Sequence, residues 1–181
     1  MSDSNWKEGL YDEKSTNPDK GLAVARMAAH ITYLSKQGLQ EKFGRNLQER
    51  SDLKFGFDAD FQIESYLRYQ GSVFVDRFDA NSYLYITRAM DYFDLTKQFN
   101  GNLSKAFEKT NSKFFVISFT SDWLYPTSEN RDIVIALNSI SKDVGFIEIT
   151  SDKGHDSFLL DVPDFLNAVR NFLETSYQKL K

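Results

Sequence analysis

The chain has 181 residues, of which 41% are hydrophobic and 27% charged, a composition typical of a soluble globular protein rather than a disordered one. Its net charge of −4 argues against nucleic acid as a partner, and no apolar run approaches the length of a membrane span. The absence of cysteine excludes disulfides, thiolate metal sites and a cysteine nucleophile, and it is compatible with a reducing cytoplasm, the location that we predict.

The N-terminal part of the chain is expected to be helical. Residues 1–18 are polar, lack the apolar core of a signal peptide and end in an Asn-Pro turn signal. A helical pattern follows over Gly21–Gln37, and then a loop over 38–58 with room for a short helix. Three short helices rich in aromatic residues are predicted next, the last with Asp79 as its N-cap: Phe61–Gln70, Val73–Phe78 and Ala80–Tyr92. Their aromatic side chains are more typical of helix packing than of a ligand site.

Two apolar runs predict a pair of parallel strands nearer the C-terminus. Phe114–Phe119 is apolar without alternation, as in a strand covered on both faces, and Val144–Ile149 is the second strand. The helix between them, capped by Thr127 or Ser128 and ending at about Ser141, completes a right-handed crossover unit. A final helix and its apolar stripe are predicted from Pro163, Phe165, Leu166, Val169, Phe172 and Leu173.

These elements predict an α/β fold class with two regions. Residues 1–110 are predicted to be largely helical, and residues 111–181 are predicted to form an α/β portion. Two strands leave unpaired edges and do not make a stable, doubly covered sheet. We therefore expect further strands to come from outside this chain.

Asp122 and His155 are candidate catalytic residues, because each lies in the loop after a predicted strand. In α/β-hydrolases a serine, an acid and a histidine follow one another in this order, each on such a loop. Asp122 would fix one tautomer of the imidazole; the alternatives are a turn-forming aspartate and an ordinary loop histidine. No two glycines lie four positions apart, so the chain holds no Gly-x-Ser-x-Gly elbow. The pattern is that of the back half of an enzyme.

Arg26 and Asp156 are candidate binding residues. Arg26 lies on the first predicted helix, on one face with His30 and Tyr33. Its guanidinium group could bind a carboxylate with two hydrogen bonds, or the side chain could extend along the helix edge into solvent. Asp156 could receive an ammonium group, or cap a helix over 157–161. No metal site is predicted, because four acidic residues lack a histidine at ligand spacing: Asp58, Asp60, Asp76 and Asp79.

Four segments resemble homoserine O-acetyltransferases, the acyltransferases of methionine biosynthesis that have the α/β-hydrolase fold. They are Gly21–Ser35, Glu64–Gly71, Phe74–Asp91 and Gly154–Leu160. The stretch Arg-Phe-Asp-Ala-Asn-Ser-Tyr-Leu in the third is long and specific, and the similarity extends over essentially the whole chain. The resemblance implies that the chain is the C-terminal half of such an enzyme. On this basis the residues up to about 110 are largely the lid of the hydrolase fold, and Asp122 and His155 are the triad acid and base.

The resemblance also implies a substrate site and a mechanism. Arg26 would take the carboxylate of L-homoserine, and Asp156 its amino group. A serine on the missing N-terminal half would accept an acetyl group from acetyl-CoA, a substrate rather than a bound cofactor, and the homoserine hydroxyl would then attack the acyl-enzyme. Without that serine the chain alone is predicted to be inactive. The full enzyme is expected to be a homodimer formed through the lid helices.

Two alternatives stay open at this point. The chain could be a non-catalytic remnant, or an interaction subunit that docks on a separate N-terminal chain. Alternatively, the same fold could serve an O-succinyltransferase, or a hydrolase that uses water as the acyl acceptor.

Overall fold

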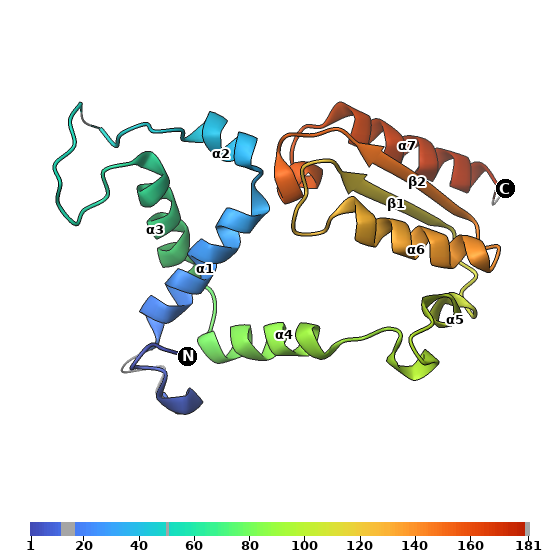
Figure 1. The fold of residues 1–181 in the computed structure, drawn as a ribbon, viewed down its shortest axis with the longest axis horizontal. Coiled ribbons are helices and arrows are strands. Elements are labelled where there is room, and N and C mark those ends of the chain that lie inside the picture. The colour runs from blue at the N-terminus through green and yellow to red at the C-terminus, as the bar shows by residue number, and fades with distance from the viewer. Residues whose placement is uncertain (12–16, 50, 180–181) are drawn as a thin grey trace. The chain divides into compact units, whose positions relative to one another are not determined.

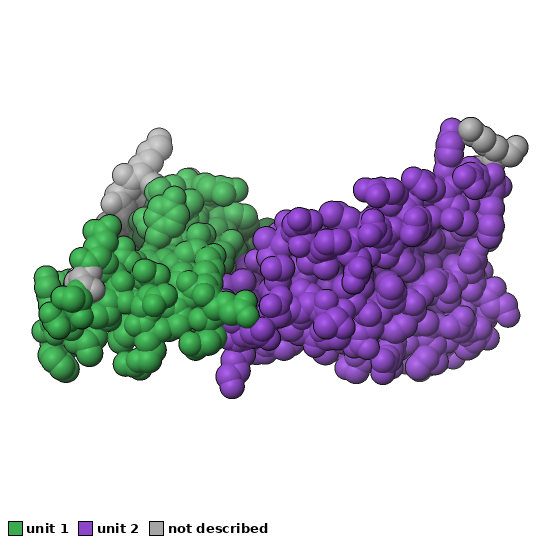
Figure 2. All heavy atoms as spheres, turned by 90° about the horizontal axis from the view of Figure 1, so that it is seen from above, with its two compact units in different colours: residues 1–32, 39–93 green, residues 33–38, 94–181 purple. Residues whose placement is uncertain are grey.

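A computed structural model describes residues 1–11, 17–49 and 51–179 (Figure 1). The chain forms two compact units, the first from residues 1–32 and 39–93 and the second from residues 33–38 and 94–181 (Figure 2). The predictions made for residues 12–16 in the polar N-terminal segment, and for residue 50 in the 38–58 loop, lie outside the described residues.

The second unit is built on a parallel β–α–β element, as the sequence predicts. Strands β1 (Phe114–Phe119) and β2 (Val144–Ile149) have the predicted bounds, and helix α6 (Thr127–Ser139) joins them. The strands pair in parallel, from Phe114 opposite Val144 to Phe119 opposite Ile149. Both carboxyl ends therefore lie at one edge of the sheet, and so do the loops that follow them.

Helices α6 and α7 (Pro163–Gln178) cover opposite faces of this sheet (Figure 1). Successive side chains of a strand point to opposite faces. Phe119 packs on Phe165 of α7, with ring centroids 5.6 Å apart. The preceding residue, Ser118, accepts a hydrogen bond from the Thr127 hydroxyl at the start of α6. Strand β1 is thus covered on both faces, which confirms the interpretation of its unbroken apolar run.

The final helix α7 begins at Pro163, as predicted. Phe172 in its apolar stripe stacks on Phe115 of β1, with ring centroids 4.9 Å apart and an interplanar angle of 20°. Leu166 and Leu173 of the same stripe are 46% and 59% exposed. Within the described chain the stripe is therefore only partly covered.

Helix α6 begins differently from the prediction, which placed Thr127 or Ser128 at its N-cap. Pro126 is the N-cap residue, in an extended conformation with φ −66° and ψ 153°, and Thr127 is the first helical residue. The Thr127 hydroxyl donates to Ser118 Oγ at 2.9 Å and does not cap the helix. The cap prediction is wrong because this hydroxyl finds a partner on β1 that the local sequence does not reveal. The helix ends at Ser139 rather than at about Ser141.

The described residues of the first unit form helices and loops. Its elements are η1 (Lys7–Gly9), α1 (Asp19–Tyr33), α2 (Lys36–Lys42), α3 (Gln62–Val75) and α4 (Ala80–Tyr92), with Tyr33 and residues 36–38 assigned to the second unit. The helix predicted over Gly21–Gln37 is therefore interrupted at Leu34 and Ser35.

Helix α3 replaces two predicted helices, Phe61–Gln70 and Val73–Phe78. The helix continues through Gly71, which is buried. A Cβ atom added to Gly71 would lie 3.0 Å from the carbonyl oxygen of Ala23 on α1. Glycine is needed here for the close approach of two helices, not for a break between them. The predicted division is therefore wrong.

Asp79 is the N-cap of α4, as predicted. Its Oδ2 accepts a hydrogen bond from the backbone N–H of Ser82 at 2.7 Å. The predicted aromatic packing is found for Phe74, Phe78 and Tyr83, with the Phe74 and Phe78 rings stacked at 5.0 Å. Other aromatic residues in or next to α3 and α4 are exposed in the described unit: Tyr69, Tyr85, Tyr92 and Phe93.

The compact units divide after residue 93, whereas the sequence placed the lid boundary at about residue 110. Residues 94–110 belong with the sheet and include η2 (Lys97–Phe99) and α5 (Leu103–Phe107). The ammonium group of Lys142 donates to the carbonyl oxygens of Glu108 and Thr110, at 2.8 and 2.7 Å. Compactness does not test which residues act as a lid, so the 1–110 lid stays a prediction. None of the helices in the described part combines the length and apolarity needed to cross a bilayer.

Candidate active site

Asp122 lies in the turn after β1, and hydrogen bonds fix its carboxylate. Its Oδ1 accepts from the backbone N–H groups of Leu124 and Tyr125, at 3.0 and 2.9 Å. Its Oδ2 lies 2.9 Å from Nδ1 of His155. The side chain is only 7% exposed. Both oxygens thus have defined partners, which orients the carboxylate toward the imidazole.

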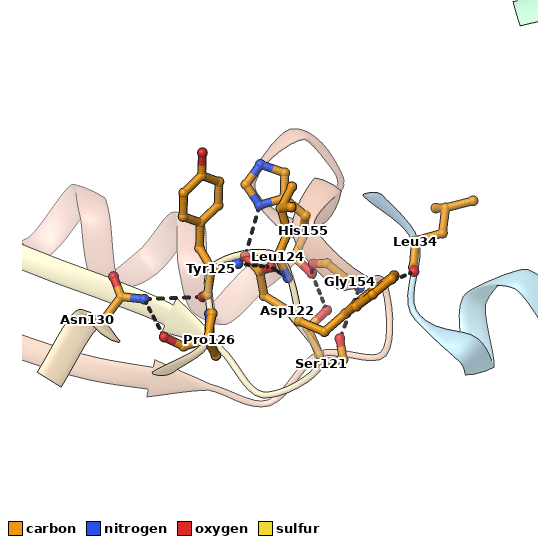
Figure 3. Close-up of polar contacts among 12 residues, drawn as sticks. Leu34, Ser121, Asp122, Leu124, Tyr125, Pro126, Asn130, Gly154 and His155 are labelled. Carbon is orange, nitrogen blue, oxygen red and sulfur yellow. Dashed lines mark hydrogen bonds and ion pairs between the residues drawn. The ribbon is translucent and has the colours of Figure 1, made fainter. Parts of the chain in front are cut away.

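His155 is the second residue of η3 (Gly154–Leu159), in the loop after β2. A carboxylate oxygen only accepts, so the short contact with Asp122 assigns the proton to Nδ1. The other ring nitrogen, Nε2, points away from Asp122 (Figure 3). In this tautomer Nε2 can take a proton from a hydroxyl group and return it to a leaving group.

Three aromatic rings surround the imidazole within the second unit. The ring centroids of Tyr125, Phe158 and Tyr33 lie 5.1, 5.5 and 6.0 Å from that of His155. The His155 side chain nevertheless keeps 22% of its surface exposed. The imidazole is therefore packed among aromatic rings and remains partly exposed.

Side-chain hydrogen bonds connect the acid loop (residues 120–126) to the base loop (residues 150–155). Thr120 Oγ1 donates to the carbonyl oxygen of Ser151 at 3.2 Å and accepts from its N–H at 3.1 Å. Ser121 Oγ accepts from the N–H of Gly154 at 2.9 Å (Figure 3). The two loops are therefore joined immediately beside the residues that carry the acid and the base. Sequence reasoning missed these contacts.

Ser157, in η3 just after the base loop, forms hydrogen bonds to that loop. It is fully buried; its hydroxyl donates to the carbonyl oxygen of Gly154 at 2.6 Å and pairs with Ser151 Oγ at 2.8 Å. Serine is common in loops, so nothing in the single sequence distinguishes Ser157 from the other serines of this region.

The structure tests the predicted binding residues only in part. Asp156 follows His155 in the first turn of η3, whose N-cap is Lys153, so its alternative role as a helix cap is wrong. Arg26 lies in the first unit, with its guanidinium carbon 4.9 Å from the centroid of Phe74. Arg26 and Asp156 belong to different units, and their roles toward a common substrate stay predictions.

Among the residues that the structure describes, no group of three or more His, Cys, Asp or Glu side chains could hold a metal ion.

Comparison with curated proteins finds relatives that share one name. No family model matches the chain. The chain is 76% identical to the homoserine O-acetyltransferase of Pelagibacter ubique over 99% of its own length and 48% of that protein. It is 60% identical to the homoserine O-acetyltransferase of Rhodospirillum rubrum, over 96% of the chain and 44% of that protein. The chain spans about half the length of the curated relatives it matches.

Solved structures share the fold. A homoserine O-acetyltransferase from Bacillus anthracis superposes with a TM-score of 0.79 at 24% identity, over 94% of this chain and 45% of that one. An esterase superposes with a TM-score of 0.76 at 23% identity, over 95% of this chain and 46% of that one. At these identities the likeness shows the fold alone, and it confirms a partial α/β-hydrolase fold.

Proposed function

We infer that the chain supplies the acid and the base of a homoserine O-acetyltransferase. The reason is that it corresponds in sequence to the C-terminal half of that family. The proposed reaction moves an acetyl group from acetyl-CoA to the hydroxyl of L-homoserine. The observation that carries the proposal is the 2.9 Å contact between Asp122 and His155, made at the carboxyl ends of neighbouring parallel strands. The nucleophilic serine is proposed to come from outside these 181 residues, which hold no Gly-x-Ser-x-Gly elbow.

In the first half-reaction the serine hydroxyl attacks the thioester carbonyl of acetyl-CoA. His155 Nε2 takes the serine proton and returns it to the departing thiolate of coenzyme A. The imidazole is positively charged between these transfers, and the Asp122 carboxylate at Nδ1 stabilises that charge. The pair of backbone N–H groups on Asp122 Oδ1 keeps the carboxylate aimed at the ring throughout.

In the second half-reaction the homoserine hydroxyl attacks the acetyl-serine ester. Nε2 now takes the proton of the homoserine hydroxyl and then protonates the departing serine oxygen. The molecule that accepts the acetyl group decides the activity: homoserine as acceptor makes the enzyme a transferase, and water makes it a hydrolase. We propose that Arg26 binds the homoserine carboxylate and Asp156 its ammonium group, which favours an amino-acid acceptor.

The direct test combines this chain with an N-terminal half. We would co-express the chain with the N-terminal half of the Pelagibacter ubique relative, because the two sequences are 76% identical where they match. Release of coenzyme A and formation of acetylated homoserine are then measured. We expect activity from the complex and none from the 181-residue chain alone. A folded complex that releases no coenzyme A, or a chain that is active alone, would refute the proposal.

Three variants sharpen this test. Asp122→Asn should lower kcat by about 10⁴-fold, because the amide would favour the wrong imidazole tautomer. Its matched control is Asp143→Asn, a change at an exposed residue that pairs with Lys113 at the other end of the strands. Arg26→Ala should leave acetyl-enzyme formation intact and raise KM for homoserine. An unchanged KM would remove Arg26 from the binding site.

Association and location follow from the same proposal. A biosynthetic acyltransferase that uses acetyl-CoA would act in the cytoplasm. We further propose that the complete enzyme is a homodimer formed through the lid helices. Sedimentation of the reconstituted complex would measure its stoichiometry, and a 1:1 complex that does not self-associate would refute the dimer.

A further inference from the structure

The segment of residues 33–38, at the junction of α1 and α2, packs within the second unit although it is distant from the base loop in sequence. Ser35 in this segment is 6% exposed. Its hydroxyl donates to the carbonyl oxygen of Asp152 in the base loop and accepts from the N–H of Gly38 at 2.9 Å. One buried hydroxyl thus connects the α1–α2 junction to the loop that carries His155.

Gly154 provides a second contact with this segment. Its φ of +75° lies in the left-handed region, and it immediately precedes His155. A Cβ atom at Gly154 would lie 2.5 Å from the backbone nitrogen of Ser35, and 2.7 Å from both the carbonyl carbon of Leu34 and the carbonyl oxygen of Tyr33. The two backbones are therefore in direct contact beside the catalytic base.

The same segment also contacts the acid loop and the imidazole. Trp123 Nε1 donates to the carbonyl oxygen of Leu34 at 3.3 Å. The ring of Tyr33 lies 6.0 Å from that of His155, at an interplanar angle of 43°. The junction therefore contacts the acid loop, the base loop and the base itself.

We propose that Ser35 is a positioning residue that acts through Asp152 and Gly154 on His155; this rests on the proposed function. Ser157 and Ser121 define the shape of the base loop and its connection to the acid loop. Ser35 instead fixes the base loop against a separate segment of backbone. Without its hydroxyl the Asp152 carbonyl loses this partner, and the loop can shift relative to the junction. A displacement of about 1 Å can lower the rate by about 10²-fold, because proton transfer depends steeply on geometry.

The experiment observes the imidazole directly. The chain has only two histidines, His30 and His155, so isotope labelling of histidine gives two ring systems in an NMR spectrum, and His155→Gln assigns them. In the wild-type chain we expect the His155 proton on Nδ1, with slow exchange against solvent. In Ser35→Ala we expect that proton to exchange about five to ten times faster, the factor that one lost hydrogen bond gives, together with averaging of the two ring-nitrogen shifts.

Controls separate positioning from a general loss of structure. Ser139→Ala removes a hydroxyl that bonds Ser104 and Ala136 at the end of α6, and it should leave the His155 signals unchanged. An unchanged His155 signal in a folded Ser35→Ala chain would overturn the proposal. If Ser35→Ala does not fold by circular dichroism, Ser35→Cys decides instead. Its thiol is a weaker donor than the hydroxyl, and here too an unchanged His155 signal overturns the proposal.

Failure of the proposed function gives a different result. If the wild-type chain shows no protected Nδ1 proton either alone or in the complex with the N-terminal half, the Asp122–His155 pair itself is not formed, and the catalytic proposal fails together with this one. If the wild-type proton is protected and Ser35→Ala leaves it so, only the role of Ser35 is refuted.

Discussion

Replacing Gly154 by alanine tests the contact between the α1–α2 junction and the base loop. Two effects combine at this position. The residue has a φ of +75°, which disfavours any side chain, and a Cβ atom would overlap backbone atoms of Tyr33, Leu34 and Ser35. Backbone atoms cannot rotate away as a side chain can, so the overlap has to move one of the two segments.

Gly101 separates these two effects. It has nearly the same φ, +79°, and a Cβ atom there would have no neighbour within 4 Å. In both variants the left-handed conformation costs about 1–2 kcal/mol, and the reduced entropy of the unfolded chain returns about 0.4–1 kcal/mol. Gly154→Ala adds an overpacking penalty of about 1–3 kcal/mol. We therefore expect it to lower the free energy of unfolding by about 1–3 kcal/mol more than Gly101→Ala does.

Urea denaturation followed by far-ultraviolet circular dichroism measures both variants in the same chain. Tryptophan fluorescence adds a local probe, because Trp123 bonds the junction. The prediction concerns only the difference in unfolding free energy between the two variants. Errors in the extrapolation of each free energy to zero urea therefore largely cancel. Equal losses of stability in the two variants would show that the junction does not abut Gly154 and would refute the reasoning.

Two further changes test the core and a helix cap. Leu137→Ala, at a residue with no exposed surface on α6, should lower the unfolding free energy by about 2–5 kcal/mol in urea titrations, whereas Ile135→Ala on the same helix, 64% exposed, should cost far less. Asp79→Ala should cost about 0.5–2 kcal/mol as a lost N-cap, and Asp91→Ala, an exposed change on the same helix, should be nearly neutral. Burial alone would raise the pKa of Asp79, but hydrogen bonds from Tyr11 and Ser82 outweigh it and hold that pKa below its usual value. This stabilisation should therefore be complete above the unfolded pKa of about 3.9 and disappear as the pH falls through the lower folded value; an Asp79→Asn chain with the same acid midpoint as wild type would contradict this.

The sequence was most informative where a pattern is local. An apolar run has one plausible structure in this context, so both strands were predicted with their bounds, and the position of Asp122 and His155 after those strands predicted their pairing. Helix α3 shows the limit of the same reasoning. A glycine looks alike in sequence whether it ends a helix or admits a neighbouring backbone, and only the contact with Ala23 distinguishes the two at Gly71.

The supporting shell of the site could not be predicted, for a physical reason. Ser35, Ser121 and Ser157 act through hydrogen bonds to backbone groups of other loops. Almost any loop can supply such an acceptor, so the bonds impose no pattern on neighbouring residues. The roles of Arg26 and Asp156 rest on family resemblance, since the spacing of their own segments does not specify a ligand.

The order in which the site assembles during folding follows from the sequence distances of its contacts. Asp122 and His155 are 33 residues apart, in the loops that follow β1 and β2, whereas Ser35 and Asp152 are 117 apart. Closing the longer loop costs about 1 kcal/mol more in chain entropy, and contacts between distant residues generally form later. The acid–base pair can therefore form early as a local event. The site is complete only after the segment of residues 33–38 has packed on the base loop and Ser35 has bonded Asp152.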